Sequence, residues 1–355
     1  MKILILKFKT IGDVLLTTPL IRNLKIHYPE SLIDVAVNKG TEDMLALNLN
    51  VSQIIVYNRV KNRQLSTLKR IYEEYKFLKN IRKSKYDIVI DLDHGDRGAG
   101  IASISGAKIK VGSSNIKSKL VRNTYTHFLP SRKGKHIVEV GLDAARTLNI
   151  PIKDKKLEIF WSKDDENTIN SLSLDNEFIH VHPLSRAYYK EVSNKIIASI
   201  VDYCELELGF KVVLTSAPID RELGEIDNIL DLCQSSPINL SGKLTLKQTA
   251  ALNKRAKLFI GVDTAVMHIS AANNTPVLAF FGPTSPDNWG PWDNDIQKSL
   301  YCRDGGTQKT GKHTVYSKKI QCMPCNNLGC NDSHISQCLI SLDIDDVKTS
   351  IKSML

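Results

Sequence analysis

Short, mainly apolar runs alternate along this chain with longer amphipathic stretches. The apolar runs lie at 2–7, 33–37, 54–57, 86–92, 178–182, 211–214, 258–262 and 277–281. Runs of this length without polar alternation are typical of parallel strands that are buried on both faces. The clearest helical stretches between them lie at 14–27, 65–82, 193–208 and 246–255. The pattern predicts an α/β protein made of two successive doubly wound, Rossmann-like units.

The chain has 355 residues, which is too long for one ordinary core and favours two domains. We expect a first domain over 1–165 and a second over 166–342, with the polar stretch 162–177 as the linker. Near the end of the chain, apolar residues recur at helical spacing: Ile344, Val347, Ile351 and Leu355. This spacing predicts a terminal helix within 343–355 that packs back on the protein.

Open parallel sheets bind ligands at the carboxyl ends of their strands, so the residues after each apolar run are the candidates for chemistry. After the first run, Gly12 permits a tight turn and Asp13 stands at the start of the next helix. An acid at that place serves either as a helix cap or as a group that faces the ligand. The loop is not a GxGxxG motif, so dinucleotide binding by the first domain is unsupported.

In the second half, the run 258–262 leads into a helix expected to begin near Thr264, directly after Asp263. A helix N-terminus has free N–H groups and a partial positive charge, which suit a diphosphate. The alternative is a helix that is simply capped. Ser185, Arg186 and Lys190, after the run 178–182, are residue types that bind phosphate. His182, at the end of that run, is interpreted as a structural histidine.

The formal net charge of +10 is concentrated in the first half. Residues 1–150 contain 26 Lys and Arg against 13 Asp and Glu, whereas residues 151–355 contain 22 against 25. This excess predicts an anionic partner, namely nucleic acid, an acidic glycolipid or a membrane surface, unless it is only a solvated face. The clusters are Lys79, Arg82, Lys83 and Lys85; Lys108, Lys110, Lys117, Lys119 and Arg122; and Arg132, Lys133 and Lys135. No nucleic-acid-binding signature accompanies them, so we expect no nucleic-acid partner.

No apolar run approaches the length that spans a bilayer, and the first run lacks the length and cleavage site of a signal peptide. A cytoplasmic protein with reduced cysteines is therefore expected. Five of the seven cysteines lie near the end of the chain, at Cys302, Cys322, Cys325, Cys330 and Cys338. Their spacing is compatible with a zinc site, with reduced packing thiols or with redox chemistry, and it leaves all three open.

Four segments together resemble glycosyltransferase family 9, the lipopolysaccharide core heptosyltransferases. They are 10–15, 241–246, 263–268 and 281–284. Ser185 and Lys190, with the segment 288–292, look most like the branch that adds the third heptose of the inner core. The resemblance implies an enzyme with the GT-B fold, in which two Rossmann-like domains face a cleft. Two alternatives are the first or second heptose position, or another glycan acceptor. A nucleotide-sugar epimerase is a further alternative.

The resemblance also implies an inverting transfer from ADP-L-glycero-D-manno-heptose to the anionic lipopolysaccharide core, without a metal or a cofactor. Asp13 matches the catalytic base. The residues that match donor contacts are Ser185 and Lys190 for the diphosphate, Glu222 for the ribose, Leu244 for adenine, Asp263 for heptose hydroxyls, Thr264 and Ala265 for phosphate, and His268 beside them. Ala265 departs from the family, which mostly has Gly there. Our candidates for acceptor binding are Arg63, Arg97, Lys117, Arg122 and Lys135, and peripheral contact with the inner membrane fits their charge.

Overall fold

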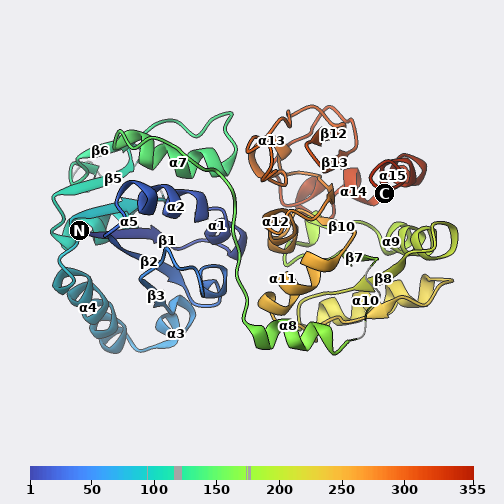
Figure 1. Ribbon diagram of the computed structural model, residues 1–355, viewed down its shortest axis with the longest axis horizontal. Coiled ribbons are helices and arrows are strands. Elements are labelled where there is room, and N and C mark those ends of the chain that lie inside the picture. The colour runs from blue at the N-terminus through green and yellow to red at the C-terminus, as the bar shows by residue number, and fades with distance from the viewer. Residues whose placement is uncertain (94, 116–121, 173, 175–176) are drawn as a thin grey trace. The chain divides into compact units, whose positions relative to one another are not determined.

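The protein consists of two compact units, Met1–Phe160 and Trp161–Leu355. Figure 1 shows the computed structural model, which describes all residues except 94, 116–121, 173 and 175–176. Each unit contains its own parallel sheet with helices on both sides (Figure 1). The prediction of an α/β protein with two Rossmann-like units is confirmed.

The sheet of the first unit has the strand order β3-β2-β1-β4-β5-β6, and all neighbours are parallel. Its strands are β1 (Lys2–Lys7), β2 (Leu32–Asn38), β3 (Gln53–Tyr57), β4 (Ile88–Asp91), β5 (Ile109–Ser113) and β6 (His127–Leu129). In the described part of this unit, the α-helices are α1 (Ile11–Leu15), α2 (Thr18–His27), α3 (Arg59–Gln64), α4 (Thr67–Lys83), α5 (Asp96–Ser105) and α7 (Ile137–Thr147). The short 3-10 turn η1 spans Glu42–Met44.

The sheet of the second unit has the order β12-β13-β11-β10-β7-β8-β9. Its strands are β7 (Phe178–His182), β8 (Lys211–Leu214), β9 (Ile238–Asn239), β10 (Leu258–Val262), β11 (Val277–Phe280), β12 (Gly306–Thr310) and β13 (His313–Ser317). Only β12 is antiparallel to its neighbour. Counted from β7, its order is 3-2-1-4-5-7-6, so the two sheets share the doubly wound order 3-2-1-4-5 and differ only beyond it.

The helices of the second unit connect these strands, and the last two follow the final strand β13. They are α8 (Lys163–Asn170), α9 (Asn194–Asp202), α10 (Asp220–Leu232), α11 (Leu246–Arg255), α12 (Ala265–Ala272), α13 (Pro286–Trp289), α14 (Gln337–Ile340) and α15 (Ile344–Lys352), with the short turns η2 (Tyr188–Lys190), η3 (Tyr203–Glu207) and η4 (Cys330–Asp332). In α15, Val347 and Ile351 are fully buried in the core that also contains α9. No helix in the described part of the chain is long and apolar enough to cross a bilayer.

Two local predictions were wrong. The expected helix 14–27 is divided into α1 and α2. Pro19 lies in the first turn of α2, where proline is favoured, so the chain begins a second helix there. The stretch 162–177, interpreted as a linker, contains α8. The side chains of Ser162 and Asp165 form a capping box at the start of this helix. Ile169 is buried in the part of the core that also contains residues of α11.

Candidate active site

In a sheet of order 3-2-1-4-5-6, ligands bind outside the carboxyl ends of the first and fourth strands, where the winding reverses. In the first unit these strands are β1 and β4, which are hydrogen-bonded neighbours. The residues that follow them are Lys7 to Asp13 after β1, and Asp91 to Asp93 at the end of β4. The topology thus brings Asp13, our candidate base, to the position where a ligand is expected.

The carboxylate of Asp13 is held on both oxygens. Its Oδ1 lies 3.1 Å from the ammonium group of Lys7, which is itself buried. Its Oδ2 accepts a hydrogen bond of 2.7 Å from the hydroxyl of Thr10, the N-cap residue of α1. Asp13 is the third residue of that helix, so it also belongs to the cap. The capping role anticipated for an acid at this place is therefore present, and the carboxylate is held in a fixed position.

Burial alone would raise the pKa of Asp13, but the charge of Lys7 and the hydrogen bonds from Thr10 outweigh it. The pKa of Asp13 therefore lies below its usual value. A carboxylate in this state is ionised at neutral pH and ready to accept a proton. Its fixed position favours proton transfer from a hydroxyl group brought to its remaining lone pairs.

Two further aspartates complete this cluster and were missed from the sequence. Asp93 accepts the backbone N–H of Phe8 with both oxygens at 2.9 Å, which ties the end of β4 to the end of β1. Asp91 is fully buried, accepts the hydroxyl of Tyr125, and has its pKa raised to about 7 by burial. The charge of Lys7 acts on all three carboxyl groups. The signal in the sequence was two acids spaced by one residue at the end of an apolar run.

The second unit repeats this arrangement at the ends of β7 and β10. The ammonium of Lys190, after β7, lies 2.7 Å from Oδ2 of Asp263, directly after β10. The hydroxyl of Thr284, after β11, donates to the same Oδ2 at 2.8 Å. Three loops at one edge of the sheet are thus held together by one buried carboxylate. Thr284 lay in a segment that carries the family resemblance but was not assigned a role.

The N-terminus of α12 adds a polar group to this edge. Thr264 is the N-cap residue, and its hydroxyl oxygen is buried without a hydrogen-bond partner. Buried hydroxyls are normally paired, so this orphan marks a place where an acceptor from a ligand fits. Ala265 begins the helix and is half-buried, while His268 lies one turn further and is buried. The free N–H groups and the hydroxyl together suit a phosphate group.

The loop after β7 is braced by a partly buried ion pair that the sequence did not reveal. Glu191 accepts two hydrogen bonds from the guanidinium of Arg221, at 2.9 and 3.0 Å, and one from the backbone N–H of Ser185 at 2.8 Å. Arg221 also donates to the carbonyl of Ser185 at 2.7 Å and lies over the ring of Tyr188. Ser185 is therefore fixed by its backbone. Glu222, expected to meet the ribose, accepts the N–H of Ala217 at 2.9 Å and is buried.

The remaining donor candidate is Leu244, which lies after β9. It packs against the core beside α11, in the turn before that helix. His182 accepts or donates a hydrogen bond of 2.9 Å with the hydroxyl of Thr215, which also contacts His180. Burial lowers the pKa of His182 to about 3 and that of His180 to about 4. Both histidines are therefore neutral structural groups, as expected for His182.

The basic residues expected to bind the acceptor fall in different situations. Arg63 is exposed on α3, and Arg122 is half-buried. Arg97 instead lies 3.6 Å from the ring centre of Tyr57 and pairs with Glu74 at 3.1 Å, and Lys135 pairs with Asp143 at 2.6 Å. Lys117 lies outside the described residues. The structure thus leaves Arg63 as the most accessible of the described candidates and gives Arg97 and Lys135 structural partners.

All seven cysteines, each within the described residues, are free thiols. Among those residues, no group of three or more His, Cys, Asp or Glu side chains is arranged to hold a metal ion. Burial, followed by the neighbouring Cys330 and Cys325, raises the pKa of the Cys338 thiol to about 11. The segment also contacts the loop after β11, since the backbone N–H of Asn326 donates to the carbonyl of Pro283 at 2.9 Å. Burial favours a packing role for Cys338 over a reactive thiolate.

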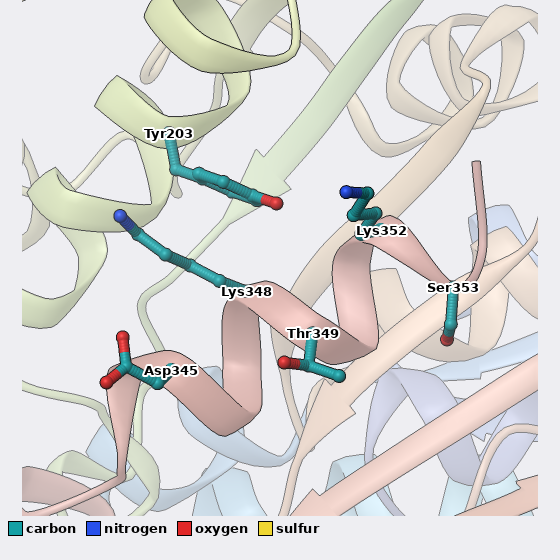
Figure 2. Close-up of a pocket in the computed structure, with 6 residues that line it drawn as sticks. All are labelled: Tyr203, Asp345, Lys348, Thr349, Lys352 and Ser353. Carbon is teal, nitrogen blue, oxygen red and sulfur yellow. The ribbon is translucent and has the colours of Figure 1, made fainter.

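A separate hollow of about 440 Å³ lies on α15 and is shown in Figure 2. It is lined by Tyr203, Asp345, Lys348, Thr349, Lys352 and Ser353. Lys348 lies over the ring of Tyr203 and pairs with Glu207 at 3.0 Å, so its charge is already used. None of the candidate site residues lines this hollow.

Comparison with known proteins shows the family to which this chain belongs. The family described as "Glycosyltransferase family 9 (heptosyltransferase)" matches residues 74–320. The chain belongs to this family. The enzyme is similar to Lipopolysaccharide heptosyltransferase 3 of Escherichia coli, with 30% identity over 292 residues, which cover 80% of this chain and 84% of the relative. The protein of the same name from strain K12 is 31% identical over 293 residues, with coverages of 80% and 83%.

Solved structures of heptosyltransferases share the fold of this family member. E. coli ADP-heptose lps heptosyltransferase II matches with a TM-score of 0.75 and 21% identity, and the match covers 100% of this chain and 98% of that one. E. coli heptosyltransferase WaaC with ADP matches with a TM-score of 0.74 and 18% identity over the whole of both chains. The GT-B architecture expected from the sequence is thus confirmed.

Proposed function

We propose that this family 9 enzyme transfers L-glycero-D-manno-heptose from ADP-heptose to the inner core of lipopolysaccharide, as the third, branching heptose. The observation that carries the proposal is the repeated Lys–Asp pair at the two sheet edges where ligands bind. One pair, Lys7 with Asp13, fixes a carboxylate that can accept a proton. The other, Lys190 with Asp263, lies beside a helix N-terminus that suits a diphosphate. The similarity to heptosyltransferase 3 supports the choice of acceptor.

In this proposal the second unit binds the donor. Lys190 has three donors, so it contacts the diphosphate while it keeps Asp263. The N-terminus of α12 and the unpaired hydroxyl of Thr264 bind the adjacent phosphate oxygens. These groups stabilise the charge that develops on ADP as the glycosidic bond breaks. Asp263 then contacts hydroxyls of the heptose, which places the anomeric carbon next to the leaving diphosphate.

The first unit supplies the base. Asp13 accepts the proton of the acceptor hydroxyl while the oxygen of that hydroxyl attacks the anomeric carbon and ADP leaves with the bonding electrons. A single displacement of this kind inverts the anomeric configuration. Lys7 and Thr10 hold the carboxylate ionised and oriented, so little reorganisation precedes the step. The basic surface of this unit then attracts the phosphates and carboxylates of the acceptor.

The decisive experiment mixes the purified protein with ADP-heptose and a lipopolysaccharide core that already bears two heptoses, and reads the acceptor by mass spectrometry. Addition of one heptose supports donor, reaction and position together. Transfer only onto a core with fewer heptoses would move the assignment to the first or second position. ADP binding without transfer to either core would contradict the acceptor class, and conversion of the donor without acceptor would indicate an epimerase.

The proposed acceptor is anchored in a bilayer, so we also propose that the protein works in the cytoplasm and contacts the inner membrane peripherally. The excess of basic residues in the first half supports contact with an anionic leaflet. Fractionation of cells that express the protein tests this. Recovery in the membrane pellet that is reversed by salt supports peripheral contact, and exclusive recovery in the supernatant would contradict it.

A further inference from the structure

Helix α4 presents a row of large apolar side chains to solvent. Leu68, Ile71, Tyr72 and Tyr75 are 82%, 60%, 62% and 56% exposed. The spacings of three and four residues place all of them on one face of the helix. Val60, on the preceding helix α3, is 70% exposed as well. Figure 1 shows both helices at the periphery of the first unit. An exposed apolar row of this size marks an interaction site rather than scattered surface residues.

The inward face of α4 is already satisfied, so the apolar row is not a core face that lacks its partner. Phe77, Leu78 and Ile81 pack against the core of the sheet. Glu74 accepts the hydroxyl of Tyr57 at 2.8 Å and pairs with Arg97. The helix is therefore apolar on two faces, and only one of them is covered by the described part of the chain.

Basic residues surround the outward row. Residues 59–85 contain ten Lys and Arg but only two Glu, and one of the two, Glu74, is engaged inward. Lys76, Lys79 and Lys83 are exposed and follow the apolar row toward the end of the helix. The ammonium of Lys79 lies 5.5 Å from the ring centre of Tyr75, so apolar and basic groups form one continuous surface.

We propose that the outward face of α3 and α4 docks on an anionic lipid bilayer, with the apolar side chains inserted among the head groups and the lysines against lipid phosphates. Amphipathic helices that lie at a membrane surface combine aliphatic and aromatic residues with Lys and Arg in this way. Long basic side chains reach the head-group level while their stems cover apolar surface. The inference rests on the proposed function only in that a lipid-linked acceptor gives the enzyme a reason to reside at a bilayer.

A second copy of the chain is the alternative occupant, and charge argues against it. A two-fold interface would place the same surface of each copy against the other, so both sets of lysines and arginines would meet. Like charges opposed across an interface are repulsive, whereas an anionic leaflet attracts them. A bilayer therefore complements both the charge and the apolar character of this surface.

The test is sedimentation of the full-length protein with vesicles of phosphatidylcholine alone or with added phosphatidylglycerol. The first variant replaces the four apolar residues of α4 with glutamine, a comparable helix former (L68Q, I71Q, Y72Q and Y75Q). The second replaces three lysines (K76Q, K79Q and K83Q). The matched control replaces exposed leucines of the second unit, which are 60% and 64% exposed (L206Q and L300Q).

We expect the wild type and the control to bind the anionic vesicles and not the neutral ones. The lysine variant should bind roughly fivefold more weakly for each charge removed, the equivalent of about 1 kcal/mol each. The apolar variant should lose binding that persists at raised salt. Equal vesicle binding by the apolar variant, or none by the wild type, would overturn the proposal. A wild-type dimer that the apolar variant abolishes, without vesicle binding, would assign the surface to a second copy.

These measurements use neither donor nor acceptor. ADP affinity of the same variants, measured by calorimetry, should equal that of the wild type because α4 belongs to the other unit from Lys190 and Asp263. A failure of vesicle binding with ADP binding intact would therefore reject the docking surface alone. A wild type that binds vesicles but not ADP would reject the proposed function and leave the docking surface standing.

Discussion

Replacing Lys190 with methionine tests the proposed donor site most directly. The Lys190 ammonium lies 2.7 Å from Oδ2 of Asp263 and 3.4 Å from its carbonyl oxygen. The side chains are 20% and 6% exposed, respectively. Lys190→Met keeps the length and the apolar stem of the side chain but removes the charge. The bound diphosphate would then lose one cation and face an Asp263 carboxylate to which, among the described residues, only Thr284 donates.

The expected loss can be worked out for binding and for folding separately. One charge-assisted hydrogen bond contributes about 1.5–3 kcal/mol, so the Kd for ADP should rise roughly 10- to 150-fold. Removing one partner of a buried ion pair costs about 3–5 kcal/mol of stability. Because the Lys190 ammonium remains partly in water, we expect a smaller cost of about 1–3 kcal/mol. The variant should therefore fold but melt at a lower temperature.

Isothermal titration with ADP and thermal unfolding without ligand provide the two readouts. Lys190→Arg should retain most of the ADP affinity because the positive charge remains. The matched control is Lys257→Met, since Lys257 pairs with Glu177 at 3.2 Å on the surface and should not affect ADP. A folded Lys190→Met protein with wild-type affinity for ADP would refute the assignment of Lys190 to the diphosphate.

Three further predictions concern the base, the core and the packing of α5. Asp13→Asn should abolish heptose transfer yet leave the Kd for ADP unchanged; turnover by this variant, or loss of ADP binding, would contradict its role as base. Since burial lowers the pKa of His180 to about 4, only the unfolded state binds its proton between about pH 4 and 6.5. The free energy of unfolding should thus fall as the pH drops from 6.5 toward 4, by up to about 3 kcal/mol for this group, as urea titrations can measure. Gly98→Ala should lower the free energy of unfolding by about 1–3 kcal/mol, because the added Cβ would meet the Asp91 carboxyl at 2.3 Å. Gly100→Ala, whose added Cβ would meet nothing within 4 Å, should raise it by about 0.5–1 kcal/mol. Equal unfolding midpoints for the two variants would contradict this.

Much of the fold could be predicted because parallel strands are buried on both faces and therefore appear in the sequence as apolar runs. Leu258 to Val262 and Ile3 to Leu6 are apolar without interruption, and all are fully buried, which leaves little ambiguity. Strand β5 (Ile109–Ser113), which lies next to the edge strand β6, alternates polar and apolar residues and therefore lacked that mark. Helix α8 was missed for a related reason, since seven of its eight residues are polar or charged and only Ile169 is buried by packing against distant residues.

The candidate site was less accessible to sequence reasoning because its contacts join distant parts of the chain. Lys190 and Asp263 could each be assigned from a local motif, but their ion pair depends on β7 and β10 being neighbours in the sheet. Asp93 contacts Phe8 across the same kind of strand adjacency. Arg97 is an example of the opposite error. A basic residue after a strand suits an anionic ligand, yet its guanidinium is occupied by Glu74 and by aromatic rings.

The double attachment of Asp13 has a consequence for how this family diverges. Its carboxylate contributes to the cap of α1 and, in the proposed mechanism, also accepts the proton, so selection on folding and selection on turnover would act on the same side chain. Asparagine or serine at this position would still accept the hydrogen bond from Thr10 and preserve the helix, but neither can serve as the base. A descendant that has lost transferase activity can therefore retain the fold and the proposed donor site around Lys190 and Asp263. Such a protein would be recognised by this one substitution. It would be a natural starting point for the evolution of a binding protein without enzymatic activity.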